Sequence, residues 1–90
     1  MQVEKKIKIV NKLGLHARAA TQLVKVAQTF SAKCTICNGE KQADASSVLG
    51  LMMLESHQGQ DIQVICEGND AKDALEAIEA LITGKFNEGE

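Results

Sequence analysis

The chain of 90 residues has few aromatic side chains and no long run of positive charge. Phe30 and Phe86 are its only Phe, Tyr or Trp residues, too few for the base-stacking surface used by many single-strand nucleic-acid binders. No run of basic residues exceeds the pair Lys5-Lys6, and the formal net charge is -2. Because nucleic-acid binding depends on clustered positive charge, we expect no nucleic-acid partner.

Long apolar segments are missing as well. The opening residues MQVEKKIKIV alternate charged and apolar side chains, whereas a signal peptide needs a continuous apolar stretch, and no segment approaches transmembrane length. We therefore expect a cytoplasmic protein without membrane insertion. The odd number of cysteines, Cys34, Cys37 and Cys66, favours reduced thiols over a disulfide framework.

What is present suits a single compact domain spanning 1–90. Hydrophobic residues make up 44% of the chain and charged residues 24%, with both signs interspersed, which is typical of a globular protein. A chain of this length can build one core and has no room for a second domain.

Periodicity predicts the elements of the first half. Residues 3–10 alternate apolar and charged side chains, as in a half-buried strand, and from Ala17 onward the spacing is that of a helix of about three turns. Runs at 32–37 and 41–45 flank Asn38-Gly39, which suits a tight hairpin turn because both residues tolerate positive φ.

The second half continues the same pattern. Ser46-Ser47 can cap a short helix over 48–54, and alternation at 62–66 predicts a fourth strand. Gly68-Asn69-Asp70 supplies a turn and a cap for a last helix, and Gly84 stands where a left-handed C-terminal cap would lie. The apolar stripe of that helix consists of Ala71, Ala74, Leu75, Ile78, Leu81 and Ile82. The order of elements predicts an α+β two-layer sandwich.

The candidate chemistry lies in the segment Gly14-Leu15-His16-Ala17-Arg18, at the start of the first helix. Unpaired amides and the positive end of the helix dipole make such a position a phosphate-binding site. A neutral imidazole at His16 would be a nucleophile toward phosphorus, and the guanidinium of Arg18 would hold phosphoryl oxygens. Gly14 lets the backbone bend beneath the ring.

The sequence lacks the residues that other kinds of phosphate chemistry require. It contains no Walker-type glycine loop, no Asp cluster for magnesium and no second histidine close to His16. We expect no cofactor and no metal, and a protein that carries phosphate without hydrolysing nucleotides. Spacing alone leaves open the alternative that His16 is an ordinary residue of a helix start and Arg18 a solvated charge.

Four segments together carry a resemblance to known proteins: NKLGLHARAA at 11–20, SSVLGLMMLE at 46–55, GQDIQV at 59–64 and the helix ending in LITGKF. They resemble the histidine-containing phosphocarrier family HPr, with its nitrogen-branch relative NPr, of the phosphoenolpyruvate-dependent phosphotransferase system. The resemblance implies an open-faced β-sandwich of order βαββαβα, with three helices covering one face of a four-stranded antiparallel sheet.

The resemblance also implies a function and partners. His16 matches the family's phosphorylated histidine, which takes a phosphoryl group on Nδ1 from phosphorylated enzyme I and passes it to an enzyme IIA domain. Arg18 matches the active-site arginine, and the amides of Ala17 and Arg18 match those that contact the phosphoryl group. We therefore expect a monomeric phosphoryl carrier with a phosphohistidine intermediate, not a free-standing enzyme.

Regulation and docking are assigned to the short second helix. Ser47 matches the serine that HPr kinase phosphorylates in many members, and a phosphate there adds about -1.5 to -2 charge, which an acidic partner would repel. That Ser46 or Ser47 merely caps the helix stays open. By resemblance, Val48, Leu49 and Met52 form an exposed docking patch, the alternative being that they are mostly core residues.

Two departures from the family pattern are visible. Ala19 stands where many members have proline after the arginine, which affects the rigidity of the first helical turn more than function. Leu13 and Ser46 stand where some sugar-transport members carry Asn or Ser, and Lys. The sequence therefore leaves open whether the chain serves sugar uptake, the nitrogen branch or a regulatory relay.

The sequence also contains residues that would fit other sites and functions. Cys34 and Cys37 have the spacing of a redox or metal motif, but positions three apart in a strand point to opposite faces, so a copper-chaperone-like metal binder is disfavoured. His57 lies in a predicted loop without neighbouring ligands, and we expect it to be exposed. The alternative function is a non-catalytic regulatory interaction module of the same fold.

Overall fold

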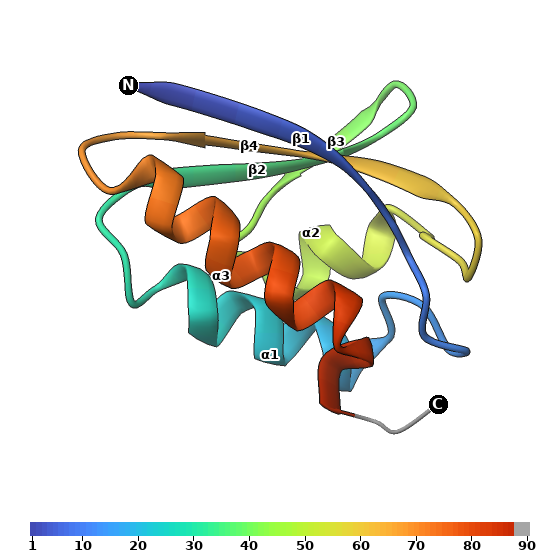
Figure 1. Ribbon diagram of the computed structural model, residues 1–90. Coiled ribbons are helices and arrows are strands. Elements are labelled where there is room, and N and C mark those ends of the chain that lie inside the picture. The colour runs from blue at the N-terminus through green and yellow to red at the C-terminus, as the bar shows by residue number, and fades with distance from the viewer. Residues whose placement is uncertain (88–90) are drawn as a thin grey trace.

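In the computed structural model, which describes residues 1–87, a four-stranded sheet is covered on one face by three helices (Figure 1). The strands are β1 (Gln2–Lys8), β2 (Lys33–Asn38), β3 (Lys41–Asp44) and β4 (Asp61–Glu67). The helices are α1 (Ala17–Ala27), α2 (Val48–Met53) and α3 (Ala71–Thr83), and a 3₁₀ turn, η1 (Lys85–Asn87), follows α3. The predicted element order and the open-faced α+β architecture are confirmed.

The sheet has the strand order β1-β4-β2-β3, and every neighbouring pair is antiparallel. In the central strand β4, Ile62 and Val64 face the helices and are buried, while Asp61 and Gln63 face solvent. This alternation explains why one face of the sheet can remain open to water. Lys5 extends from the helix side of β1 and pairs with Glu79 of α3 at 2.6 Å.

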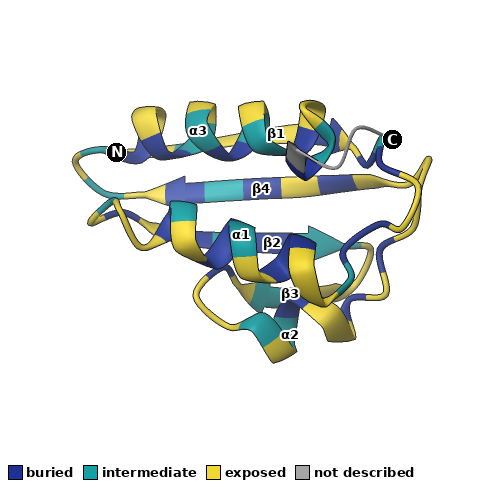
Figure 2. Ribbon diagram, turned by 90° about the horizontal axis from the view of Figure 1, so that it is seen from below, coloured by how far each residue is buried: buried dark blue, intermediate teal, exposed yellow. Residues whose placement is uncertain are grey.

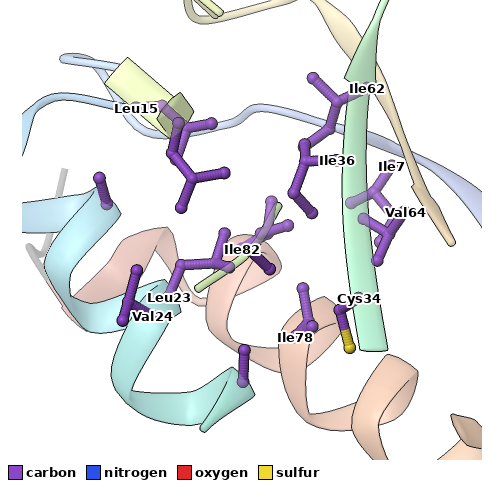
Figure 3. Packing of buried hydrophobic residues seen from close by; sticks show 14 of the residues in the cluster. Ile7, Leu15, Leu23, Val24, Cys34, Ile36, Ile62, Val64, Ile78 and Ile82 are labelled. Carbon is purple, nitrogen blue, oxygen red and sulfur yellow. The ribbon is translucent and has the colours of Figure 1, made fainter. Parts of the chain in front are cut away.

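The three helices cover one face of the sheet, and their apolar residues pack against it (Figure 1). Viewed from the helix side, α3 lies nearest β1, and α2 lies beside β3 (Figure 2). The apolar residues of α1 at helical spacing are all buried; they are Ala20, Leu23, Val24 and Ala27. Leu23 and Ile82 point toward one another between the two long helices (Figure 3). Across residues 1–87, no helix combines the length and apolar character needed to cross a membrane.

The first strand is shorter than the predicted range 3–10. β1 ends at Lys8, and Ile9 leaves the regular ladder while keeping two backbone bonds to the segment before β4. Ile9 N–H donates to the carbonyl of Gln60 at 2.9 Å, and Gly59 N–H donates to the carbonyl of Ile9 at 2.8 Å. The pairing with the segment before β4 therefore extends beyond the strand itself.

The hairpin turn lies one residue later than predicted. Asn38 still belongs to β2 and pairs with Lys41, so the two-residue loop is Gly39-Glu40. Only Gly39, with φ +65°, adopts the left-handed conformation. Asn38 stays in the strand, where its side-chain amide donates hydrogen bonds to the segment after α2.

Asp70 has a different partner from the one predicted. It occupies the N-cap position of α3, but its side chain makes no capping hydrogen bond. Its carboxylate instead accepts N–H bonds from Ser31 at 2.9 Å and Ala32 at 2.8 Å. These bonds, that from Ser31 first, lower the pKa of the Asp70 carboxyl from its ordinary value. Asp70 therefore joins the start of α3 to the segment that leads into β2.

The predicted left-handed cap at Gly84 is wrong. Gly84 has φ -84°, and the left-handed residues are the next two, Lys85 with φ 57° and Phe86 with φ 53°. This turn directs Phe86 into the core, where it is fully buried. A Cβ at Gly84 would lie 3.0 Å from the carbonyl oxygen of Ala80, so the position is tight for a side chain although its backbone is not left-handed.

Asp70→Asn tests the link between α3 and the segment before β2. A carboxyl with a lowered pKa stabilises the fold above its unfolded-state pKa of about 4 and loses this contribution as pH falls through its lower folded-state pKa. We expect Asp70→Asn to be less stable than wild type at pH 7, and its stability to depend less on pH below about 4. Urea unfolding at a series of pH values measures both.

Glu76→Gln, on the exposed face of α3, is the control for this experiment. It removes a carboxylate from the same helix without touching the bonds to Ser31 and Ala32. If the stability of Asp70→Asn falls with acid as steeply as that of wild type, this pH dependence does not come from Asp70.

Candidate functional site

His16 is the residue directly before α1, at its N-cap position. Its backbone is extended, with φ -78° and ψ -179°, and its carbonyl accepts the first helical hydrogen bond from Ala20 N–H at 2.9 Å. The side chain is half-buried and forms no capping hydrogen bond with the helix. The ring thus lies at the helix start, where the sequence predicted it, and the helix does not use it as a cap.

The first turn of α1 provides the setting for an anion. Ala17 and Arg18 are its first two residues and both are exposed, whereas Ala19 and Ala20 are buried and anchor the turn in the core. Amides in a first helical turn have no carbonyl one turn earlier to bind, and the helix dipole is positive there. No acidic residue lies in this turn to compete for the amides. Arg18 adds planar charged donors two residues after the histidine.

Gly14 makes a close contact that another residue could not make. Its φ is +65°, and a Cβ at this position would lie 2.2 Å from the carbonyl oxygen of Ser56. The same oxygen accepts the N–H of Leu15 at 3.1 Å. The backbone just before His16 therefore rests directly on the backbone at Ser56, and only glycine permits this approach.

The segment 54–60, between α2 and β4, supports the whole loop that precedes His16. In addition to the bond at Leu15, the side chain of Gln58 donates to the carbonyl of Val10 at 3.2 Å. Within the loop, buried Asn11 donates through Nδ2 to the carbonyl of Gly14 at 2.9 Å. The loop before His16 is therefore fixed both by its own Asn11 side chain and by residues 54–60. We call 54–60 the supporting segment.

The helix α2 begins at Val48, as predicted, with Ser47 at its N-cap position, and it packs against α1. The Ser47 hydroxyl accepts the N–H of Gly50 at 3.0 Å, which is a capping bond. Asp44 accepts two bonds from Ser46, from Oγ at 2.7 Å and from N–H at 2.8 Å, and these lower the pKa of its carboxyl. A carboxylate therefore lies close to the start of α2.

Of the three residues predicted to form the docking patch, two are exposed. Leu49 and Met52 have exposed fractions of 69% and 39%, whereas Val48 is half-buried and packs against the core. Met53 and Leu13 are also exposed, although the predicted patch did not include them. Met53 follows Leu49 by four positions, so helical spacing already placed the two on one face. Their role in docking stays a prediction.

The cysteines occupy two faces of the sheet. Cys34 and Cys66 are buried opposite one another on β2 and β4, and burial raises the pKa of the Cys34 thiol and raises that of Cys66 to about 12. Cys37 is half-buried, with its Sγ 4.0 Å from Gln42 Oε1. Among residues 1–87, no three His, Cys, Asp or Glu side chains are grouped as a metal site would require. His57 is exposed, as predicted.

Nearly the whole chain matches the model of a known family. The family model described as "PTS HPr component phosphorylation site" matches residues 3–84. The chain belongs to the HPr family. Membership supports a phosphocarrier role in the phosphotransferase system, with proteins of that system as partners.

Relatives within the HPr family are similar over nearly the whole chain. Phosphocarrier protein NPr of Shewanella violacea is 53% identical, covering 97% of this chain and 96% of the relative. Phosphocarrier protein HPr of Cupriavidus necator is 40% identical, with coverage of 91% and 92%. The crystal structure of HPr-C-His from Thermoanaerobacter tengcongensis superposes with a TM-score of 0.91 at 38% identity, covering 96% of this chain and 97% of that one.

Gly14→Ala tests the close approach at the site, and Gly39→Ala is its matched control. Both glycines have φ +65°, but a Cβ at Gly39 meets nothing within 4 Å. We expect Gly39→Ala to lower the free energy of unfolding by roughly 1–2 kcal/mol, the cost of a left-handed alanine. Gly14→Ala adds the clash with the Ser56 carbonyl, for a loss of roughly 2–4 kcal/mol. Chemical denaturation measures both; equal losses would contradict the close contact.

Proposed function

We propose that this HPr-family chain accepts a phosphoryl group on Nδ1 of His16 from phosphorylated enzyme I and passes it to an enzyme IIA domain. The observation that supports the proposal most directly is the position of His16, immediately before the first-turn amides of α1. Arg18 follows on the exposed side of the same turn. Nucleophile, amides and permanent positive charge thus come from three consecutive residues.

The proposed transfer needs no cofactor. The lone pair of Nδ1 attacks phosphorus, the bond between phosphorus and the donor atom of enzyme I breaks, and that bond's electron pair stays with the donor. The amides of Ala17 and Arg18 and the guanidinium of Arg18 stabilise the charge on the phosphoryl oxygens as the group arrives. Transfer to enzyme IIA repeats these steps with the chain as donor. The chain is therefore a carrier and not a free-standing enzyme.

Within this function, the nitrogen branch is better supported than sugar uptake. The relative with 53% identity is named NPr, against 40% for the HPr of Cupriavidus necator. Leu13 and Ser46 also depart from the residues of some sugar-transport members. We propose a nitrogen-type enzyme I and enzyme IIA as partners, with residues 1–90 acting as one monomeric, cytoplasmic domain.

Phosphorylation in a defined assay tests the proposal. With enzyme I and phosphoenolpyruvate, we expect one phosphoryl group per chain, labile in acid and stable in base, detected by intact-mass spectrometry. His16→Ala should abolish the gain because it removes the accepting nitrogen. His57→Ala is the matched control, since the chain has 2 histidines and His57 lies in an exposed loop.

The same assay separates the competing readings. Arg18→Ala should keep the modification at His16 but slow transfer by about tenfold to a hundredfold, the effect of losing one charged hydrogen bond. Faster transfer from a sugar-type than from a nitrogen-type enzyme I would contradict the assigned branch. No mass gain with either enzyme, each active on its own carrier, would favour the non-catalytic interaction module.

Regulation at Ser47 forms a second part of the proposal. Ser47 is exposed at the start of α2, so a kinase such as HPr kinase can reach its hydroxyl. A phosphate there adds about -1.5 to -2 charge beside the Asp44 carboxylate and near exposed Leu49. Docking of an acidic partner surface would then be weakened by repulsion.

Ser47→Ala separates the capping role from the regulatory one. Losing the bond to Gly50 should lower the free energy of unfolding by about 1 kcal/mol, measured by urea denaturation. With HPr kinase and ATP, the variant should also lose an acid-stable phosphate that wild type gains. Ser46→Ala, one residue earlier, is the control and should still be phosphorylated. If the kinase does not modify the wild-type chain, Ser47 has only its capping role.

A further inference from the structure

The supporting segment 54–60 is itself held by a residue far from it in sequence. The side-chain amide of Asn38, at the end of β2, donates through Nδ2 to the carbonyl of Leu54 at 3.2 Å and to Ser56 Oγ at 3.1 Å. Its third contact is to Gln60 Oε1 at 3.5 Å. One half-buried amide thus reaches both ends of the supporting segment.

Two of these contacts lead directly to the backbone beneath His16. Ser56, contacted through its hydroxyl, is the residue whose carbonyl accepts Leu15 N–H at 3.1 Å. Gln60, contacted through its side chain, uses the same Oε1 to accept His57 N–H at 2.8 Å. Asn38 therefore contacts the supporting segment, and the backbone of that segment contacts the loop before His16. The green hairpin, the yellow segment after α2 and the blue segment before α1 follow one another at this end of the molecule (Figure 1).

We propose that Asn38 is a positioning residue for phosphoryl transfer at His16, because it fixes the supporting segment on which Leu15 rests. This inference rests on the proposed function for its kinetic consequence, but its structural consequence is independent of that function. Phosphoryl transfer is sensitive to placement of the nucleophile, and displacements of about 1 Å lower rates by up to about a hundredfold.

The chemistry of the contacts specifies what the residue must provide. The carbonyl of Leu54 can only accept a hydrogen bond, so the side chain facing it must carry an N–H. An aspartate has the same shape but offers only oxygens, which would face the Leu54 carbonyl and Gln60 Oε1 without a hydrogen. A role in packing alone would tolerate this substitution, whereas a positioning role through hydrogen bonds would not.

The experiment compares Asn38→Ala and Asn38→Asp with wild type in two measurements. The first is hydrogen exchange of the Leu15 amide, followed by NMR; loss of the supporting bonds should accelerate it by about tenfold. The second is transfer from enzyme I to His16, where we expect kcat to fall by roughly tenfold while KM changes by less than about twofold. Both substitutions should act in the same direction.

Two controls separate positioning from general loss of stability. Asn69→Ala removes an exposed asparagine from the turn before α3, and Val3→Ala weakens β1 at the other end of the sheet. Neither variant should change kcat. Neither should accelerate exchange of the Leu15 amide by more than its change in global stability explains. If Asn38→Ala does not fold, Gln60→Ala, at an exposed position, removes the third acceptor and should accelerate Leu15 exchange in the same way.

The outcomes distinguish this inference from the function on which it rests. Leu15 exchange that stays at the wild-type rate in the folded Asn38 variants would overturn the inference, as would an equal fall of kcat in Val3→Ala. If wild type itself receives no phosphoryl group, the proposed function fails, and the exchange measurement alone still decides whether Asn38 holds the loop.

Discussion

The bond from Leu15 N–H to the carbonyl of Ser56 is the constraint on which the site depends. It joins two segments that are 41 positions apart in the chain, and it forms at 3.1 Å because Gly14 has no side chain to separate them. With the backbone fixed one residue earlier, His16 has a defined direction when the chain enters α1. The buried residues Ala19 and Ala20 anchor the first turn of α1 in the core, so the amides of that turn are fixed in place as well.

The sheet brings these two segments together. β1 and β4 pair in antiparallel register, with Lys8 opposite Asp61, so the chain leaving β1 and the chain entering β4 meet at one end of the sheet. The bonds of Ile9 to Gly59 and Gln60 continue that pairing into the loops. The position of the histidine is therefore a consequence of strand register. The core maintains that register, because a slip by one residue would turn the buried side chains of the strand toward solvent.

Local patterns in the sequence predicted the elements well, and the long-range contacts poorly. Alternation and helical spacing identify α1, β4 and the Ser47 cap because each depends on residues within one turn or one strand. Asp70 illustrates the limit, since an aspartate before a helix is ordinarily a cap, and its actual partners lie 38 and 39 positions away. The left-handed turn at Phe86 has the same cause, because burial of the ring in a distant core decides it. For the site, spacing placed His16 at the helix start but gave no sign that Ser56 supports it.

On the proposed function, the openness of the site follows from reversible transfer. A carrier that enclosed its phosphoryl group would bind it too tightly to release it, whereas backbone amides and one exposed guanidinium at Arg18 hold it from one side only. The other side is left for the partner, whose docking over exposed apolar residues such as Leu49 and Met52 would exclude water during transfer. Because the partner is present only during transfer, the permanent support of the histidine must come from the chain itself. The contacts of the supporting segment supply it, through the backbone bond between Leu15 and Ser56, the close approach at Gly14 and the side-chain bonds of Asn38 and Gln58.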